Sequence, residues 1–510
     1  MNRITTSAAI GLCLCALLYL SSFIALAPAL GWNDMRLVPS FYLAAGLDIY
    51  GKLPELGLTT LYGPAMAVSF LPATLATTPT SAICLASLIA VAFGFVSVLV
   101  PSVSLVKILK AKLSNQNRLL LLSLPIAMAL ILRSTGYSSF SIHADSPAIC
   151  ALSLAAWAVV NCDKKWSHPL AAFLVVYAML CKVVYGAGIP ALVLAVWWTH
   201  GRRPALQQSV WLLAFLAATL GVCAAHFGMR EMIDAMIAVP QAHPWNLYSQ
   251  FDSTYAKGIG STIPWKILCL VHLTTLMVTA WLLPFVVLRI GWAFLPSHDL
   301  AGPERSIRNW AKTLLVFAAC LTPGGILGFS KLGGDINALG APVHFLLLLG
   351  LSMLLPHAAT LLNHRAIQHA AVLTVIVLSL RLLNLAGINW LRTDFRLYDR
   401  IQQTMHHHPD EIWFYTRPLA HWFFEKQDIL SGDVLYCYEL AGRKFDSVWI
   451  KNHLPSKFGY AAAYKFDPSA KEAPKIIQAT AREAMVELGN GFNVFAKIGE
   501  NLAPASDRKP

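Results

Sequence analysis

Residues 80–106 read TSAICLASLIAVAFGFVSVLVPSVSLV, a run of 27 residues without a charged side chain. About 20 consecutive apolar residues are enough for an α-helix to cross the hydrocarbon core of a bilayer, so this stretch predicts a membrane span. Comparable apolar stretches recur from the first line of the sequence to about position 390. The sequence therefore predicts a polytopic α-helical membrane protein.

The composition of the whole chain supports this class. Of its 510 residues, 56% are hydrophobic and only 13% are charged, and the mean hydropathy is +0.57. A soluble protein of this length needs more polar side chains to cover its surface, so the composition excludes a cytosolic enzyme, a disulfide-built secreted domain and a disordered chain. An outer-membrane barrel is also excluded, because its strands would alternate apolar and polar residues.

We expect eleven transmembrane helices. They are predicted at residues 4–30, 80–106, 117–134, 146–162, 167–184, 187–200, 206–226, 264–290, 310–330, 338–356 and 367–390. The first is taken as a retained span, although the small residues Ala25-Leu26-Ala27 also fit the cleavage site of a signal peptide.

The distribution of lysine and arginine predicts the orientation. With the N-terminus inside, fourteen basic residues lie in or near the inner loops and eight lie outside. Inner loops carry the excess of positive charge in membrane proteins, so the N-terminus is predicted in the cytoplasm and the C-terminus outside. The expected location is a bacterial inner (plasma) membrane, with the C-terminal part in the periplasm.

Two domains follow from the change in composition near residue 393. Residues 1–392 form the transmembrane domain, with long outer loops at 31–79 and 228–263, and residues 393–510 form a small exterior α/β domain. The exterior domain is expected to contain helices near 394–405, 419–426 and 474–488 and strands at 412–415, 447–451, 461–466 and 492–498.

Carboxylates gather on the predicted outer side. Of the eleven acidic residues in the first 390, eight fall in outer loops. One explanation is that the outer loops are longer and collect more polar residues. The other is that an outward-facing site uses these carboxylates, because ionisable groups at membrane depth are costly to keep without a role.

The first outer loop carries the most informative motif. It contains Trp32-Asn33-Asp34-Met35-Arg36, then Phe41-Tyr42, Asp48-Ile49-Tyr50 and Leu61-Tyr62-Gly63-Pro64, and a late span is preceded by Gly333-Gly334-Asp335-Ile336-Asn337. An acid at the outer mouth of a span followed by this order of aromatics, glycine and proline resembles the first outer loop of the GT-C glycosyltransferases. It is most similar to the mannosyl and arabinosyl transferases that use polyprenyl-phosphate sugars.

The resemblance implies a GT-C-like fold and roles for particular residues. Asp34 matches the acid of that loop and would be the catalytic base, since sugar transfer from a lipid phosphate needs a group that takes the proton of the acceptor hydroxyl. Arg36 would hold the donor phosphate. The alternatives without a role in the reaction are a turn or a helix cap for Asp34 and contact with lipid headgroups for Arg36. Tyr62 of the Tyr-Gly-Pro motif would bind substrate.

The second outer loop and a late helix mouth supply the other candidates. Asp145, in Ser141-Ile142-His143-Ala144-Asp145-Ser146-Pro147, would be a second catalytic acid that orients sugar or acceptor, with His143 binding substrate. Its alternative role is the N-cap of the next span. Lys331, Asp335 and Asn337 would bind substrate, with Lys331 on the phosphate; its alternative is a lysine that snorkels to the interface.

The function expected from this resemblance is transfer of a sugar from a polyprenyl-phosphate donor to a glycan or lipid acceptor, in the cell envelope and in contact with membrane lipid. We expect no nucleic-acid partner, since no basic helix or aromatic-basic groove accompanies the net charge of +13. No metal site is expected, although the resemblance leaves a divalent cation as an alternative. The rival classes are a transporter or flippase of a lipid-linked sugar and a non-enzymatic membrane assembly subunit.

Overall fold

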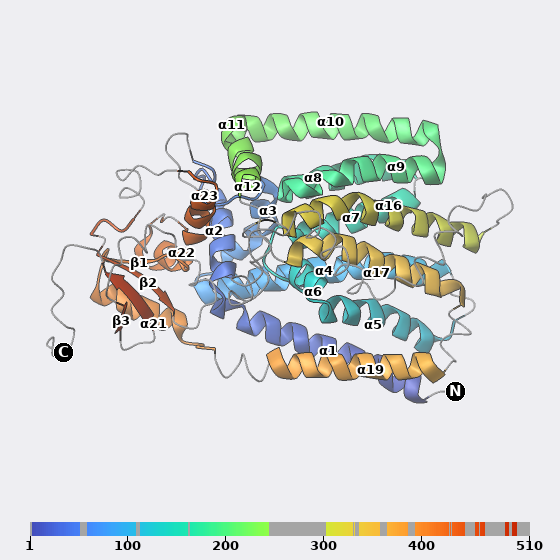
Figure 1. Cartoon of the computed structure of the whole chain (residues 1–510), viewed down its shortest axis with the longest axis horizontal. Helices are drawn as coiled ribbons and strands as arrows, with labels where there is room; N and C mark the ends of the chain where they lie inside the picture. Colours follow the sequence, from blue (N-terminus) through green and yellow to red (C-terminus); the bar gives the residue numbers. More distant parts are fainter. Residues whose placement is uncertain are drawn as a thin grey trace, which may run out of the picture.

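A computed structural model of the chain describes residues 3–51, 59–108, 113–161, 164–243, 302–329, 331, 336–357, 365–385, 393–427, 429, 431–443, 454–457, 459–464, 485–488 and 492–496. Long helices lie side by side along the long axis of the molecule, and the C-terminal domain lies at one end of this bundle (Figure 1). The bundle helices are α1 (Arg3–Leu26), α4 (Pro79–Ile108), α5 (Asn115–Ile131), α6 (Arg133–Phe140), α7 (Asp145–Val160), α8 (Ser167–Cys181), α9 (Gly188–His200), α10 (Arg202–Phe227), α16 (Pro303–Phe329), α17 (Gly340–Leu354) and α19 (Arg365–Leu382).

The chain is a polytopic helical membrane protein. Among the described residues, six helices are long and apolar enough to cross a membrane, or seven if α5 and α6, which meet at 98°, form one broken span. Helices α7 and α8 and the apolar helix at His369–Leu385 are shorter. The predicted span at 264–290 lies outside the described residues, so the count of eleven stays a prediction.

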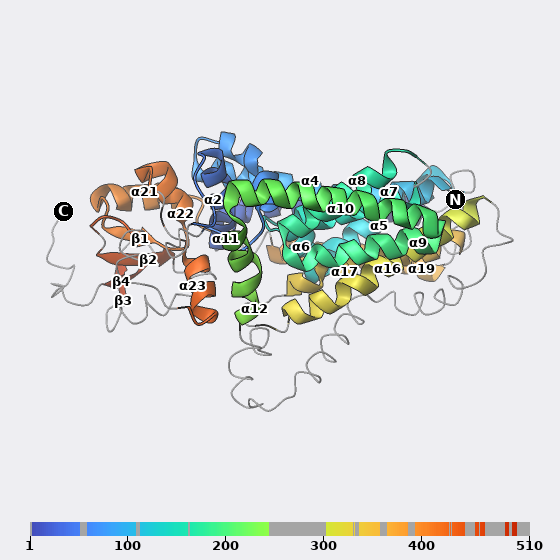
Figure 2. The same ribbon diagram turned by 90° about the horizontal axis from the view of Figure 1, so that it is seen from above.

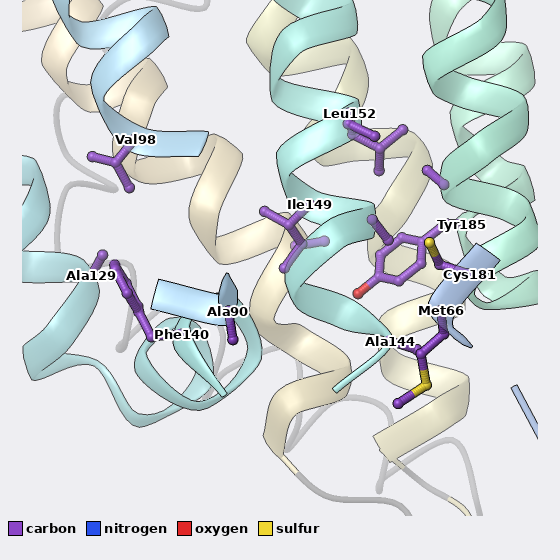
Figure 3. Close-up of a cluster of buried hydrophobic side chains, with 14 of the residues drawn as sticks. Met66, Ala90, Val98, Ala129, Phe140, Ala144, Ile149, Leu152, Cys181 and Tyr185 are labelled. Atoms are coloured by element: carbon purple, nitrogen blue, oxygen red, sulfur yellow. The ribbon is translucent and has the colours of Figure 1, made fainter. Parts of the chain in front are cut away.

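Helix α7 lies at the centre of the bundle. It packs against α4, α6, α8, α9 and α16, and alanines such as Ala148, Ala151 and Ala155 let these helices approach closely. Figure 3 shows Ile149 and Leu152 of α7 among side chains from neighbouring segments, including Tyr185. Because α7 is held on all sides, its first residues are fixed in position at the domain end of the bundle.

Short helices connect the bundle to the C-terminal domain. Residues 31–79 contain α2 (Gly31–Ala44), α3 (Pro64–Ser69) and a 3-10 turn η2 (Leu71–Leu75), and α3 packs against α8. Residues 228–243 form α11 (Met229–Ile233), a π-helical turn η5 (Asp234–Ala238) and α12 (Val239–Ala242), which turn away from the bundle axis (Figure 2). These elements lie in the predicted long outer loop 228–263.

The C-terminal domain combines helices with a four-stranded sheet. Its elements are α21 (Leu397–His407), β1 (Ile412–Phe414), α22 (Pro418–Ala420), a π-helical turn η10 (His421–Glu425), α23 (Gly432–Leu440), β2 (Tyr460–Tyr464), β3 (Met485–Leu488) and β4 (Phe492–Ala496). The strand order is β1-β2-β4-β3, with β1 and β2 parallel and the other pairs antiparallel. A parallel pair needs a crossover, and α22 and α23 lie in the connection from β1 to β2.

Two expectations about this domain are corrected. Residues 485–488 form strand β3 rather than the end of a helix, because they pair antiparallel with β4. Helix α23 was not expected, since its sequence GDVLYCYEL begins with glycine and contains residues that suit strands. The strand expected at 447–451 lies outside the described residues.

Candidate functional site

A buried carboxylate, Asp145, is surrounded by four donors at the domain end of the bundle. Its Oδ1 accepts hydrogen bonds from Lys182 Nζ at 3.0 Å and Tyr185 Oη at 2.8 Å. Its Oδ2 accepts from Asn337 Nδ2 at 2.8 Å and lies 2.8 Å from His143 Nδ1. The carboxylate is 0% exposed, and four donors favour its charged form. We call Asp145, His143, Tyr62, Lys182, Tyr185 and Asn337 the Asp145 cluster.

His143 connects this carboxylate to a tyrosine. Its Nε2 lies 2.9 Å from the hydroxyl of Tyr62, and burial lowers the pKa of His143 to about 4 against the opposing pull of Asp145. The imidazole is therefore neutral at pH 7 and carries one proton. The contact of Nδ1 with the charged carboxylate is shorter than the 3.2 Å contact with the main-chain N–H of Asp145, so we assign the proton to Nδ1. Nε2 then accepts from Tyr62, which gives a chain Tyr62–His143–Asp145.

Close approaches between segments hold this chain in place. The main-chain N–H of Gly63 donates to the carbonyl of Cys181 at 3.0 Å, and a Cβ on Gly63 would lie 1.8 Å from the carbonyl oxygen of Leu180. Glycine is therefore required beside Tyr62 at the end of α8. The hydroxyl of Tyr50 also donates to the carbonyl of Tyr62 at 2.8 Å, which fixes the tyrosine from the other side.

Two cations, Lys182 and Arg36, interact with Tyr62. Lys182 Nζ is 5.8 Å from the ring centroid, and its side chain is 24% exposed. Arg36 lies between the rings of Trp32 and Tyr137, at 5.4 and 5.7 Å, and donates to the Tyr137 hydroxyl at 2.8 Å. Among the described residues, the Nε–H of Arg36 has no hydrogen-bond partner. Both cations retain donors for an anionic ligand.

The stability of the protein is expected to decrease as the pH decreases, because folding lowers the pKa of His143. The unfolded histidine has a pKa near 6.5 and the folded one about 4, so the stabilisation is fully present above about pH 6.5 and is lost as pH falls toward 4. The loss is roughly 3 kcal/mol in the free energy of unfolding. Thermal unfolding of purified protein between pH 7 and 4 measures it, with His143→Gln as the non-titrating variant. Parallel pH profiles for the two proteins would contradict the assignment.

Asp34 lies in different surroundings. It is 0% exposed, in the first turn of α2; its Oδ1 accepts from the main-chain N–H of Leu419 at 2.8 Å, and its Oδ2 accepts from the hydroxyl of Tyr398. Beside it, Arg417 donates to the carbonyls of Pro28 and Ala29 at 2.8 and 2.7 Å. We call Asp34, Tyr398, Leu419, Arg417, Pro28 and Ala29 the Asp34 joint. It fastens the C-terminal domain to α2 and to the 3-10 turn η1 (Ala27–Ala29) that precedes it.

Of the other residues expected at the site, one lies in the Asp145 cluster, one lies outside it and one falls outside the described residues. Asn337, on the 3-10 turn η7 (Ile336–Leu339), belongs to the cluster. Lys331 instead donates to the carbonyls of Pro240 and Gln241 at 3.0 and 2.6 Å, where it stabilises the C-terminal end of α12. Asp335 lies outside the described residues. Within the described part of the chain, no group of three or more His, Cys, Asp and Glu side chains is placed to hold a metal ion.

The alternative role of Asp145 as an N-cap is wrong. Helix α7 begins at Asp145 itself, and Ala144 occupies the N-cap position without a side-chain cap hydrogen bond. The carboxylate is thus free to accept from the cluster rather than from its own helix.

Sequence reasoning missed Lys182 and Tyr185. A usable signal existed for Lys182, which falls inside the apolar stretch 167–184, where a charged side chain usually has a role. Tyr185 carries no comparable signal, since an aromatic residue at the end of a span is ordinary.

No family model, no curated protein and no solved structure matches this chain.

Proposed function

We propose that this chain is an integral membrane glycosyltransferase that transfers a sugar from a polyprenyl-phosphate donor to a glycan or lipid acceptor. The observation that carries the proposal is the chain Tyr62–His143–Asp145 beside the cations Arg36 and Lys182. The chain offers a route for a proton, and the two cations offer positive charge to a phosphate group. The site lies at the end of an apolar helical bundle, where the chain of a lipid donor can reach it. In the proposed orientation this end faces the periplasm.

The proposed reaction uses each group once. The acceptor oxygen attacks the anomeric carbon while the bond from that carbon to the phosphate oxygen breaks. The acceptor hydroxyl passes its proton to Tyr62 as Tyr62 passes its own to Nε2 of His143, and the Asp145 carboxylate stabilises the imidazolium that forms. Burial raises the pKa of Tyr62, so its hydroxyl transmits the proton and is not itself the base. Arg36 and Lys182 stabilise the departing phosphate.

This assignment gives Asp34 a positioning role. A base must reach the acceptor hydroxyl, whereas both oxygens of Asp34 accept hydrogen bonds inside the Asp34 joint. Asp34 lies in the first turn of the helix that carries Arg36 two residues later, so the joint sets where that guanidinium lies. Asp34 as the base stays a prediction, which an Asp34→Asn variant separates from the positioning role.

The overall test is a transfer assay with purified full-length protein in nanodiscs. A panel of polyprenyl-phosphate sugars is supplied with envelope glycans or lipids, and both the released polyprenyl phosphate and the glycosylated product are measured. A glycosyltransferase releases one polyprenyl phosphate for each sugar transferred. Movement of the lipid-linked sugar across a proteoliposome membrane without release would identify a transporter instead. The absence of release, movement and any glycan change in a deletion strain would favour an assembly subunit.

Loss of the Arg36 guanidinium is expected to weaken use of the donor. Arg36→Gln should raise the KM for the polyprenyl-phosphate sugar roughly 10- to 100-fold, because a charge-assisted contact to phosphate is lost. The matched control is Arg230→Gln, since Arg230 is an exposed arginine on α11. An Arg36→Gln enzyme with an unchanged KM would remove Arg36 from the phosphate site.

A further inference from the structure

The C-terminal domain brings a carboxylate, Asp433, to the phosphate-binding side of the site. Asp433 is the second residue of α23, which packs against both α2 and α12 (Figures 1 and 2). Its side chain is partly exposed and interacts electrostatically with Arg36 and Tyr62. The domain thus places a negative charge beside the cation that has donors left for a ligand.

The position of α23 is fixed by contacts on several sides. His243 Nε2 lies 3.0 Å from the carbonyl oxygen of Cys437, and Arg443 forms an ion pair with Asp234 of η5. These contacts join α23 to the segment 229–243. Asp433 is therefore held at a defined place relative to Arg36.

Among the described residues, three titratable groups interact with Asp433. From α2 it faces Arg36, from residues 59–63 it faces Tyr62, and on its own helix the thiol of Cys437 lies 3.9 Å from Oδ1. Asp433 and Arg36 interact at longer range than an ion pair: within the described residues, no salt bridge of 4.0 Å or less includes Asp433. Asp433 thus leaves the Nε–H of Arg36, which has no hydrogen-bond partner among the described residues, available to an anionic group.

We propose that Asp433 is the resident counter-ion of Arg36, and that binding of a phosphate monoester to Arg36 is coupled to the uptake of one proton by Asp433. The inference rests on the proposed function, because it takes the polyprenyl phosphate released in that reaction, a phosphate monoester, as the ligand. Two negative groups on one guanidinium repel each other, and neutralising the carboxylate removes the repulsion. Burial already raises the pKa of Asp433, and Arg36 and the Cys437 thiol only partly offset it.

The coupling gives the C-terminal domain a role in the reaction cycle. While the phosphate site is empty, the charged Asp433 balances Arg36. When the sugar has been transferred and the phosphate has become a monoester, Asp433 takes up a proton, changes from an acceptor to a hydrogen-bond donor and donates to an oxygen of the departing phosphate. The affinity for the phosphate therefore depends on a residue of the C-terminal domain.

The test is calorimetric titration of purified full-length protein in detergent with farnesyl phosphate. Titrations in two buffers of different ionisation enthalpy give the number of protons taken up. Asp433→Asn should bind about tenfold tighter at pH 7.5, the order expected when one like charge several ångströms away is removed. Its proton uptake should be lower than that of the wild type by up to one proton for each ligand bound. Comparing the two proteins cancels the titration of the ligand itself.

Two controls separate the possible failures. Asp399→Asn removes the same charge from an exposed position on α21 and should bind like the wild type. Arg36→Gln should lose binding, which shows where the probe binds. If Asp433→Asn has unchanged affinity and unchanged proton uptake, or binds more weakly, while Arg36→Gln loses binding, the coupling is wrong and the proposed function stands. If the wild type does not bind farnesyl phosphate, both are contradicted.

Discussion

Replacement of Asp145 by asparagine is expected to lower the rate of sugar transfer by roughly three to four orders of magnitude. The neutral amide no longer stabilises the imidazolium of His143. Its NH₂ group is a donor, and it would face the groups that donate hydrogen bonds to the wild-type carboxylate, among them Lys182 and Asn337. The measurement is the initial rate of polyprenyl-phosphate release by purified protein in nanodiscs at saturating donor.

The control for this variant must exclude loss of the fold. Asp145→Asn leaves Lys182 beside an uncharged partner and is expected to lower stability as well, so thermal unfolding accompanies the assay. Tyr62→Phe removes a single hydroxyl from the same chain and should still lower the rate by roughly two orders of magnitude. A folded Asp145→Asn protein that retains a rate within a few-fold of the wild type would exclude the proposed proton route.

The helical membrane class could be predicted from the sequence because it depends on local composition. A run such as residues 80–106 forms a helix in a bilayer whatever its neighbours are, since only backbone hydrogen bonds within the segment satisfy its polar groups. The described helix α4 covers this run. The break between α5 and α6 was harder to predict, because its 98° bend depends on contacts with α4 and α17 as well as on sequence.

The candidate site was predictable in part. His143 and Asp145 are two residues apart, and Asn337 lies at the mouth of a late span, so each carried a local signal. Their meeting with Lys182 depends on how α7, α8 and η7 pack, and one sequence without relatives does not give these contacts. Asp433 was harder still, since it lies in a helix that was not expected and more than 390 residues from Arg36.

Asp34 illustrates a different limit of sequence reasoning. An aspartate at the outer mouth of a span has the same local appearance whether it faces a substrate or another domain. Its partner Tyr398 is 364 residues away along the chain, and only the docked C-terminal domain brings that hydroxyl to the carboxylate. The resemblance predicted a base, whereas the contacts favour a positioning role.

Removal of the Arg417 side-chain charge is expected to have the second-largest effect, on stability. Arg417→Gln removes the donors of two part-buried hydrogen bonds to the carbonyls of Pro28 and Ala29, and a hydrogen bond to a charged group contributes about 1.5 to 3 kcal/mol. The free energy of unfolding should fall by roughly 3 to 5 kcal/mol. Amide hydrogen exchange in residues 393–427 and thermal unfolding in detergent measure it. The control is Arg396→Gln, because Arg396 is an exposed arginine of the same domain, and it should change stability by less than about 0.5 kcal/mol.

The two roles considered for Asp34 predict opposite patterns when Asp34→Asn is compared with Arg417→Gln. If Asp34 acts through the joint, both variants loosen the C-terminal domain, and both lose transfer activity through a raised KM for the donor, since α2 carries Arg36. Lowering the temperature should then restore activity to both as the domain docks again. If Asp34 is the base, Asp34→Asn stays inactive at every temperature although its hydrogen exchange matches the wild type, while Arg417→Gln recovers. The kcat of cooled Asp34→Asn therefore decides which carboxylate takes part in the chemistry.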